Sequence, residues 1–138
     1  MPESPIERLL SVLDARDLEG AMALLSPRVR MLSADGRRAE GSDAVRALVT
    51  DFMSSVRAMT HRITAHWHQD HVWIAEVDAT YELSDWLQTE PLPRAFIVRA
   101  GADGIEDLRV YGAHEAPLAD HDERQGRTLV GGRWMPPL

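Results

Sequence analysis

Residues 60–83 read THRITAHWHQDHVWIAEVDATYEL, and they decide the fold because apolar residues recur at every second position along most of the stretch. A period of two is typical of β-strands that are buried on one face. Two long strands are therefore expected, at 60–68 and 71–84, joined by a tight connection at Gln69-Asp70.

The middle of this stretch, HWHQDH (66–71), matches H-x-H-x-D-H, the zinc-binding signature of the metallo-β-lactamase superfamily. Three imidazoles and a carboxylate are a donor set that can hold zinc and activate a water. In a hairpin, however, His68 and Asp70 would lie in the loop. His66 and His71 would then face opposite sides of the sheet and would not converge on one ion. We therefore predict no metal site.

The register of this hairpin follows from its apolar residues, because directly opposed residues of an antiparallel pair share a face. A two-residue turn would place Ile63 opposite the charged Glu76. A three-residue loop instead places Ile63 opposite Ala75 and Ala65 opposite Trp73. The second register keeps the apolar residues together, and we prefer it.

Three helices are expected before the hairpin. The first begins at Ser4-Pro5-Ile6-Glu7, which combines an N-cap serine, a proline at the first helical position and a capping-box glutamate. The second runs from Asp17 to about Leu25 and is stopped by Ser26-Pro27. The third begins at Ser42. Its apolar stripe is the clearest in the chain and consists of Val45, Leu48, Val49, Phe52, Met53 and Val56.

Further strands are expected at 28–32 and 37–40, around a turn at Asp35-Gly36, and at 93–100 and 105–115. Helices followed by a run of hairpins are typical of an α+β fold. We predict a curved antiparallel sheet wrapped around the N-terminal helices, which cover one of its faces.

The composition is that of one globular domain, with 138 residues, 44% hydrophobic and 27% charged. The formal net charge of -7 argues against nucleic acid as a partner, because phosphate binding needs a basic surface. No cysteine is present, so disulfides and thiolate metal sites are excluded. The N-terminus does not resemble a signal peptide, and no apolar run reaches the ~20 residues of a membrane helix. We expect a cytoplasmic protein that does not bind membranes.

The order of these elements resembles a known family. The stretches LLSVLDARDLEGAMALLSPRVRML (9–32), EGSDAVRALVTDF (40–52) and GIEDLRVYGAHEAPL (104–118) are similar to the SnoaL-like branch of the nuclear-transport-factor-2-like superfamily. The resemblance covers about residues 5–118. It implies a cystatin-like α+β cone with an apolar pocket between sheet and helices, and a homodimer formed through the outer face of the sheet. Members include polyketide cyclases, ketosteroid isomerase, limonene epoxide hydrolase and scytalone dehydratase.

The resemblance also divides the chain. A single SnoaL-like domain is expected over residues 1–118. The remaining residues, 119–138, form a polar and Gly-rich tail that is either disordered or docked on a partner subunit.

The catalytic groups of those family members do not carry over to this chain. The tyrosine and two aspartates of ketosteroid isomerase correspond to Leu9, to Leu32 or Ser33, and to Phe96. The late aspartate of the cyclases corresponds to Gly112, which cannot transfer a proton. Limonene epoxide hydrolase needs an Asp-Arg-Asp set inside the pocket, whereas the available residues of those types, Asp78, Arg99 and Asp107, are expected on the outer face.

The outer face of the sheet is expected to carry charges of mixed sign. Its polar residues are Arg62, Thr64, His66, Glu76, Asp78, Thr80, Glu82, Arg99, Asp107, Arg109 and Tyr111. It is either a solvated surface or a dimer surface, and the second interpretation is favoured by Ile74 and Ile97, which interrupt the charge.

The inner face predicts an apolar, aromatic-lined pocket of the kind that binds small molecules. Its expected ligand-binding residues are Trp67, Trp73, Phe96, Val98, Val110, Gly112, Leu9, Met31 and Phe52. Gly112 in a strand interior leaves space where other residues would fill it. Tyr81 and His114 are the candidate catalytic groups, and the imidazole of His114 could act as acid, base or hydrogen-bond donor. Trp86, in the loop before Pro91, is a candidate cover for the pocket mouth.

The sequence thus predicts a protein that binds a small, largely apolar ring compound, with acid-base isomerase or cyclase chemistry as one outcome. The alternative is a non-catalytic ligand-binding or dimerisation module. No cofactor is implied, and the sequence leaves open whether the protein is an enzyme.

Overall fold

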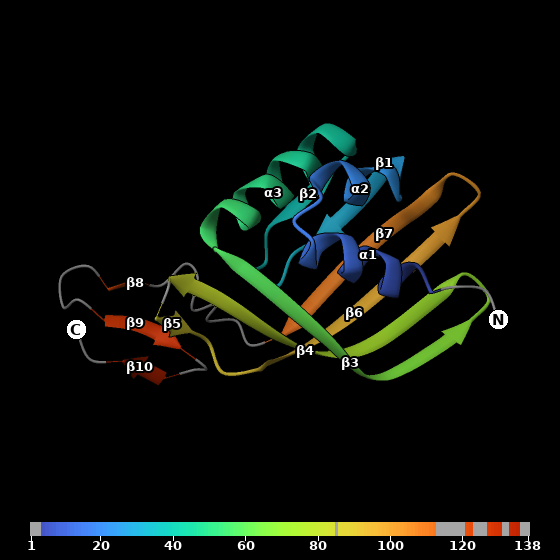
Figure 1. Ribbon diagram of the computed structural model, residues 1–138. Coiled ribbons are helices and arrows are strands. Elements are labelled where there is room, and N and C mark those ends of the chain that lie inside the picture. Colours follow the sequence, from blue (N-terminus) through green and yellow to red (C-terminus); the bar gives the residue numbers. More distant parts are fainter. Residues whose placement is uncertain (1–3, 85, 113–120, 123–126, 131–132, 136–138) are drawn as a thin grey trace.

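The computed structural model describes residues 4–84, 86–112, 121–122, 127–130 and 133–135 of the chain. Its helices are α1 (Pro5–Asp14), α2 (Leu18–Ala23) and α3 (Ser42–Ser55). The strands of its main sheet are β1 (Leu25–Leu32), β2 (Arg38–Glu40), β3 (Ala58–Gln69), β4 (Val72–Ser84), β5 (Leu87–Gln88), β6 (Leu92–Gly101) and β7 (Gly104–Gly112). Figure 1 shows the three helices together on one side of this curved, open sheet.

The main sheet is mixed. Its strand order is β2-β1-β7-β6-β4-β3, and β5 pairs with β4. β1 runs parallel to β7, with Met31 opposite Leu108, while the other pairings of this sheet are antiparallel. The α+β cone is therefore confirmed, but the expectation of a wholly antiparallel sheet is wrong. Parallel neighbours need a long crossover connection, which α3 and the strands from β3 to β6 supply.

Gly104 opens β7 at the place where that strand meets β1. Its φ is 114°, and a Cβ atom at this position would lie 2.7 Å from the carbonyl oxygen of Leu24. The next residue, Ile105, donates its amide to the same oxygen at 2.9 Å. Glycine at 104 permits this close backbone approach, which starts the parallel pairing.

The helix starts follow from local capping. The Ser4 side chain accepts a hydrogen bond from the amide of Ile6 at 3.1 Å, and the Asp17 side chain accepts one from Gly20 at 2.8 Å. Both N-caps are as predicted. α3 begins at Ser42 as expected, although its N-cap is Gly41, which offers no side-chain hydrogen bond.

The end predicted for the second helix is wrong. α2 stops at Ala23, and Leu25 already belongs to β1, where it pairs with Ile105. Ser26 and Pro27 lie inside this strand instead of marking a helix stop. Pairing with β7 extends the strand toward the helix, a tertiary effect that overrides the local turn signal.

The hairpin between β3 and β4 has a register different from the one we preferred. The turn lies at Asp70 and His71, so that Gln69 pairs with Val72, and the ladder shifts between Ile63 and Ala65. Ile63 is opposite Val77, and Ala65 is opposite Glu76. The three-residue loop is therefore wrong, because a bulge absorbs the extra residue within the strand.

The bulge also changes which side chains of β3 face inward. Met59 and Ile63 lie on the inner face, opposite the buried Tyr81 and Val77. Beyond the bulge the alternation is reversed, so His66 faces inward and Trp67 outward, with half of its surface (50%) exposed. The expectations of an outward His66 and an inward Trp67 are both wrong for this reason.

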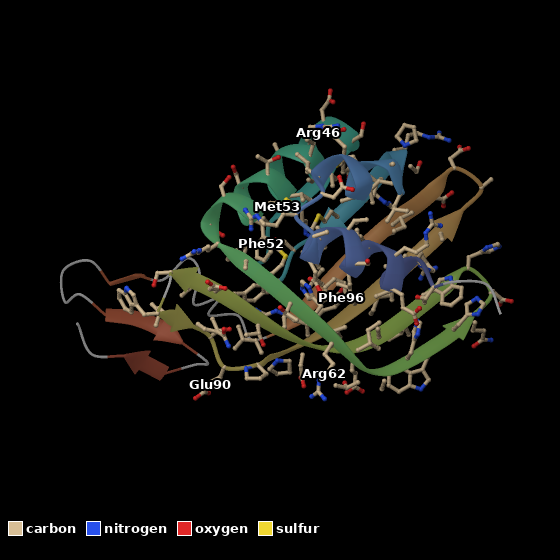
Figure 2. The ribbon with its side chains drawn as sticks, viewed as in Figure 1. Arg46, Phe52, Met53, Arg62, Glu90 and Phe96 are labelled. Carbon is tan, nitrogen blue, oxygen red and sulfur yellow. The ribbon has the colours of Figure 1, made fainter. Side chains whose placement is uncertain are left out.

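The core lies between the helices and the concave face of the sheet. α1 contributes Ile6, Leu9 and Leu10, and α3 contributes Val45, Val49 and Met53, all of them buried. Against them pack buried residues of β4, β6 and β7: Ala75, Val77, Ala79, Phe96, Val98, Ile105 and Leu108. Figure 2 shows Phe52 and Phe96 in this layer, while Arg62 points away from it.

The described parts of the tail form a second, small sheet. It consists of β8 (His121–Asp122), β9 (Arg127–Val130) and β10 (Arg133–Met135), in the order β10-β9-β8. Whether the tail docks on a partner subunit stays a prediction. Across the described residues, no helix is both long and apolar enough to cross a membrane.

Candidate functional site

A cavity of about 350 Å³ lies between the helices and the sheet. Its apolar lining among the described residues is Leu9, Leu13, Ala21, Leu25, Met31, Ala34, Leu48, Val49, Phe52, Phe96, Leu108 and Val110. Three polar side chains from three neighbouring strands also reach it: His61 of β3, Tyr81 of β4 and Arg94 of β6. An apolar cavity with a few polar groups is the usual character of a small-molecule site.

His61 forms a pair with Asp14, the last residue of α1. Its Nδ1 lies 2.6 Å from one carboxylate oxygen of Asp14, and its backbone amide donates to the other oxygen at 3.0 Å. The His61 side chain is only 3% exposed, and the Asp14 side chain is 28% exposed. Both carboxylate oxygens are thus used, which fixes the position of the imidazole against the end of the helix.

The rings around His61 hold it edge to face. Its centroid lies 6.2 Å from that of Tyr81 and 6.0 Å from that of Phe96, with interplanar angles of 83° and 89°. Because Asp14 engages Nδ1, Nε2 is the nitrogen left to meet a ligand in the cavity that His61 lines.

Tyr81 and Arg94 form the second polar feature of the cavity. Arg94 is 4% exposed, and its side chain lines the cavity together with that of Tyr81. Burial raises the pKa of Tyr81 above its ordinary value of 10.0, against the opposing effects of the Arg94 charge and hydrogen bond. The phenol therefore stays protonated at neutral pH and remains able to donate a hydrogen bond.

Gly112 makes room for Arg94. The two residues are paired across β6 and β7, and a Cβ atom at Gly112 would lie 2.3 Å from Nη1 of Arg94. The space that the sequence predicts beside Gly112 is therefore occupied by the arginine side chain. Gly112 itself lines a separate hollow on the sheet, together with Thr64, Asp78 and Tyr111.

The remaining lining residues of the cavity are polar and come from the β1–β2 turn and from α3. Asp35 accepts a hydrogen bond from Arg37 Nε at 2.7 Å, and Arg37 Nη1 lies 3.6 Å from the Asp51 carboxylate on α3. Burial acts to raise the pKa of Asp35, but hydrogen bonds from Ser33 and Arg37 outweigh it, so this pKa lies below its ordinary value. Charged side chains of both signs therefore adjoin the apolar part of the cavity.

The predicted site residues divide into two groups. Those that line the cavity are Leu9, Met31, Phe52, Tyr81, Phe96 and Val110. Val98 is fully buried behind the lining, and Trp73 packs on the core with its indole stacked on His68 at a centroid distance of 3.5 Å. Trp67 and Trp86 are exposed and do not line the cavity. His114 lies outside the described residues.

The residues of HWHQDH are dispersed in the structure. His66 contacts Ser4, the N-cap of α1, and His68 lies in β3 and not in the loop that we predict from the sequence. Asp70 occupies the turn with a φ of 54°. Within the described part of the chain, no three His, Cys, Asp or Glu side chains gather as a metal ion would require.

The aspartates of this chain that match the residue types needed for epoxide hydrolysis lie on the outer face, as expected. Asp78 pairs with Arg62 at 3.0 Å. Asp107 pairs with Arg109 at 3.1 Å and with Arg30 at 3.4 Å, on the side of β7 opposite to the cavity-lining Leu108.

Sequence reasoning missed three polar residues of the site: Asp14, His61 and Arg94. Each carried a usable signal. Arg94 alternates with Phe96, which already marks the inner face, and His61 precedes the inward Ile63 by two positions. Asp14 follows Leu10 by four positions and so lies on the buried side of its helix.

Helices on the concave face of an open, curved sheet, with an apolar cavity between them, define an α+β cone of the nuclear-transport-factor-2-like class. Residues 6–108 match the SnoaL-like domain family, and the chain therefore belongs to that family. This confirms the resemblance inferred from the sequence. No curated protein matches the chain.

Several solved structures share the fold. A hypothetical protein with a ketosteroid isomerase-like fold from Catenulispora acidiphila, in complex with trimethylamine, has a TM-score of 0.71 at 11% identity, over 80% of this chain and 86% of that one. An NTF2-like protein of unknown function from Burkholderia pseudomallei has a TM-score of 0.71 at 15% identity, over 80% and 88%. An LEH-like epoxide hydrolase from M. tuberculosis has a TM-score of 0.68 at 15% identity, over 79% and 80%. At such identities the likeness shows the fold alone.

Proposed function

We propose that this protein catalyses proton transfer on a small, largely apolar ring compound, as an isomerase or cyclase does. The observation that carries the proposal is the Asp14–His61 pair, in which an imidazole that lines an apolar cavity has its Nδ1 2.6 Å from a carboxylate oxygen. The cavity volume of about 350 Å³ falls within the range of small-molecule sites, roughly 300–1,000 Å³.

His61 takes the role of general base. With its Nδ1 proton donated to Asp14, the neutral imidazole has a lone pair on Nε2 that accepts a proton from the ligand. The negative charge of Asp14 stabilises the imidazolium that forms. The second contact, from the His61 amide to Asp14 at 3.0 Å, holds the two groups in place before the ligand binds.

Tyr81 and Arg94 take the role of stabilising negative charge. A neutral Tyr81 donates a hydrogen bond to an oxygen of the ligand, and the guanidinium of Arg94 strengthens that donor. In a cavity with a mostly apolar lining, such an interaction is stronger than it would be in solution. The pair Tyr81–Arg94 and the base His61 line the same cavity, so one ligand can meet both.

The reaction that suits these groups begins at a carbon next to a carbonyl group. The C–H bond breaks, Nε2 of His61 takes the proton, and the electron pair moves to the carbonyl oxygen, where Tyr81 donates to the resulting enolate. Where a C=C bond of the ligand is conjugated with the enolate, return of the same proton to the far carbon of that bond shifts the double bond, gives an isomer and restores the neutral imidazole. Attack of the enolate carbon on a second carbonyl group of the ligand would instead close a ring, and the oxygen of that carbonyl group would become an alkoxide that takes the proton back from His61.

Deuterium exchange tests the first step without knowledge of the natural ligand. 2-Tetralone is incubated with the protein in D₂O, and loss of its α-proton signals is followed by NMR against a protein-free sample. We expect the wild type to accelerate exchange, and His61→Gln and Asp14→Asn to reduce the acceleration by roughly a hundredfold or more. His71→Gln, which changes an exposed histidine of the β3–β4 turn, is the matched control and should leave the rate unchanged.

Two results would overturn catalysis. Equal exchange in the wild type and in His61→Gln, together with a thermal shift on binding, would favour the non-catalytic ligand-binding alternative, for which the mostly apolar lining is sufficient. Neither binding nor exchange with a panel of aromatic and polyketide-like ketones would favour a dimerisation module. The homodimer and the cytoplasmic location stay predictions from the sequence.

A further inference from the structure

We propose that His66 is a positioning residue for the Asp14–His61 pair, acting from the opposite end of α1. The inference rests on the proposed function for its catalytic meaning. Contacts at the N-terminal end of α1 fix the position of the helix along β3. This position in turn determines where Asp14, at the other end of the helix, meets His61.

The N-terminal end of α1 is tied to β3 through Ser4. The Ser4 hydroxyl oxygen lies 3.0 Å from Nε2 of His66 and accepts hydrogen bonds from the amides of Ile6 and Glu7 at 3.1 and 3.4 Å. Glu7 adds a carboxylate oxygen 3.6 Å from Nδ1 of His66. With two amides donating to its oxygen, the serine hydroxyl has its proton left to donate to the neutral imidazole. One serine therefore both caps the helix and attaches it to the strand.

The C-terminal end of the same helix is tied to the same strand by the Asp14–His61 pair. The distance between the two contact points is similar on the helix and on the strand. From Ser4 to Asp14 the helix advances ten residues, about 15 Å at 1.5 Å per residue. From His61 to His66 the strand advances five residues, about 16 Å. α1 and β3 run in opposite directions along each other (Figure 1), so both ends meet their histidines.

The bulge in β3 is what allows both contacts. Residues five positions apart in a regular strand point to opposite faces, so His61 and His66 would not both face the helix. The shift between Ile63 and Ala65 reverses the alternation and turns both imidazoles to the inner face. Because of the bulge, this one strand can contact both ends of α1.

The hydrogen bond of the pair provides a direct readout. A proton shared between Nδ1 of His61 and the Asp14 carboxylate at 2.6 Å is expected to give an NMR signal far downfield, assigned by its loss in His61→Gln. We expect His66→Ala to shift or broaden this signal, and His66→Gln, whose amide can still bond Ser4, to restore it. His68→Ala is the matched control, because His68 stacks on Trp73 instead of contacting α1.

Exchange of 2-tetralone gives the second readout. A displaced Asp14 should lower kcat for exchange by about 10- to 100-fold in His66→Ala while KM changes little, because the cavity lining is unaltered. If His66→Ala does not fold, Ser4→Ala breaks the same contact and is measured in its place.

The outcomes separate the two proposals. A His61 signal that is unchanged in both His66→Ala and Ser4→Ala overturns the positioning role, even if His61 proves catalytic. A signal that shifts in a protein without any exchange activity supports the positioning role while the proposed function fails. Absence of the signal from the wild type would contradict the pair itself and this inference with it.

Discussion

At the scale of single residues, the phenol of Tyr81 packs edge to face with the rings of Phe52 and His61, at centroid distances of 5.4 and 6.2 Å. Its enclosure removes water from the hydroxyl group and disfavours the charged phenolate, whereas Arg94 favours it. The raised pKa shows that burial outweighs the guanidinium. The Tyr81 hydroxyl group therefore stays protonated, and able to donate a hydrogen bond, over a wider range of pH than a tyrosine in solution.

This shift predicts an alkaline titration specific to Tyr81. The chain has two tyrosines, so in Tyr111→Phe the tyrosinate absorbance reports Tyr81 alone, and we expect a midpoint above 10.0. Because the folded pKa is raised, the contribution to stability is complete below pH 10 and is lost as pH rises through the folded pKa. Tyr81→Phe should lose stability less steeply above pH 10 in urea titrations. A midpoint at or below 10.0 would contradict the enclosed phenol.

The periodicity of the sequence is enough to predict some of the residues that line the cavity. Leu9, Phe52 and Phe96 line the cavity as their helical and strand periods predict. Trp67 does not, because one inserted residue reverses the faces beyond the bulge. The indole is large and amphipathic, and nothing in its own chemistry indicates which face it takes.

At the scale of elements, Arg16 links the first two helices to the third. It lies between α1 and α2 with a left-handed φ of 57°, and its guanidinium donates to the carbonyl oxygens of Met53 at 2.7 Å and Val56 at 3.2 Å. These carbonyl groups belong to the end of α3 and its C-cap, which have no further helical turn to bond them. A cation at a helix C-terminus is also favoured by the helix dipole.

We therefore expect Arg16→Ala to lower the free energy of unfolding by about 1–2 kcal/mol, measured by urea denaturation. Arg16→Gly removes the same cap but relieves the left-handed backbone, so it should be the less destabilised of the two. Equal stability of both variants and the wild type would show that neither the cap nor the backbone conformation contributes.

The elements themselves were largely predictable, because their signals are local. Ser4 and Asp17 cap helices where their side chains suggest, and the period of two marks each long strand. The parallel pairing of β1 with β7 was not predictable in this way. It joins residues far apart in the sequence, and it shortens α2 against the local signal at Ser26-Pro27.

At the scale of the whole molecule, the outer face of the sheet carries an apolar stripe across three strands. Trp67 of β3 is opposite Ile74 of β4, which is opposite Ile97 of β6. Tyr111, 41% exposed, lies on β7 and adds a second exposed aromatic ring. Charged side chains share this face: Arg109 of β7 is opposite Ile97, and Arg62 pairs with Asp78 further along β3 and β4. Apolar groups rimmed by charges are typical of an interaction surface.

The predicted homodimer is expected to use this stripe. Light scattering coupled to size exclusion should give the mass of two chains for the wild type, and Trp67→Glu or Ile97→Glu should give one, because a carboxylate would be buried without a partner. Trp86→Glu changes an exposed tryptophan next to β5, away from the stripe, and should remain dimeric. A monomeric wild type at micromolar concentration would contradict the dimer.

The sequence by itself determined where helices begin, where the chain alternates as strands, and hence the α+β class, because capping and periodicity depend on neighbouring residues. Only the tertiary structure decided the bulge in β3, the mixed sheet and the meeting of Asp14 with His61 across 47 positions. The ladder shift lies between the two histidines of β3 that contact the ends of α1, so it belongs to the way the strand packs against the helix. That packing brings an acid and an imidazole together, and no local pattern in the chain specifies it.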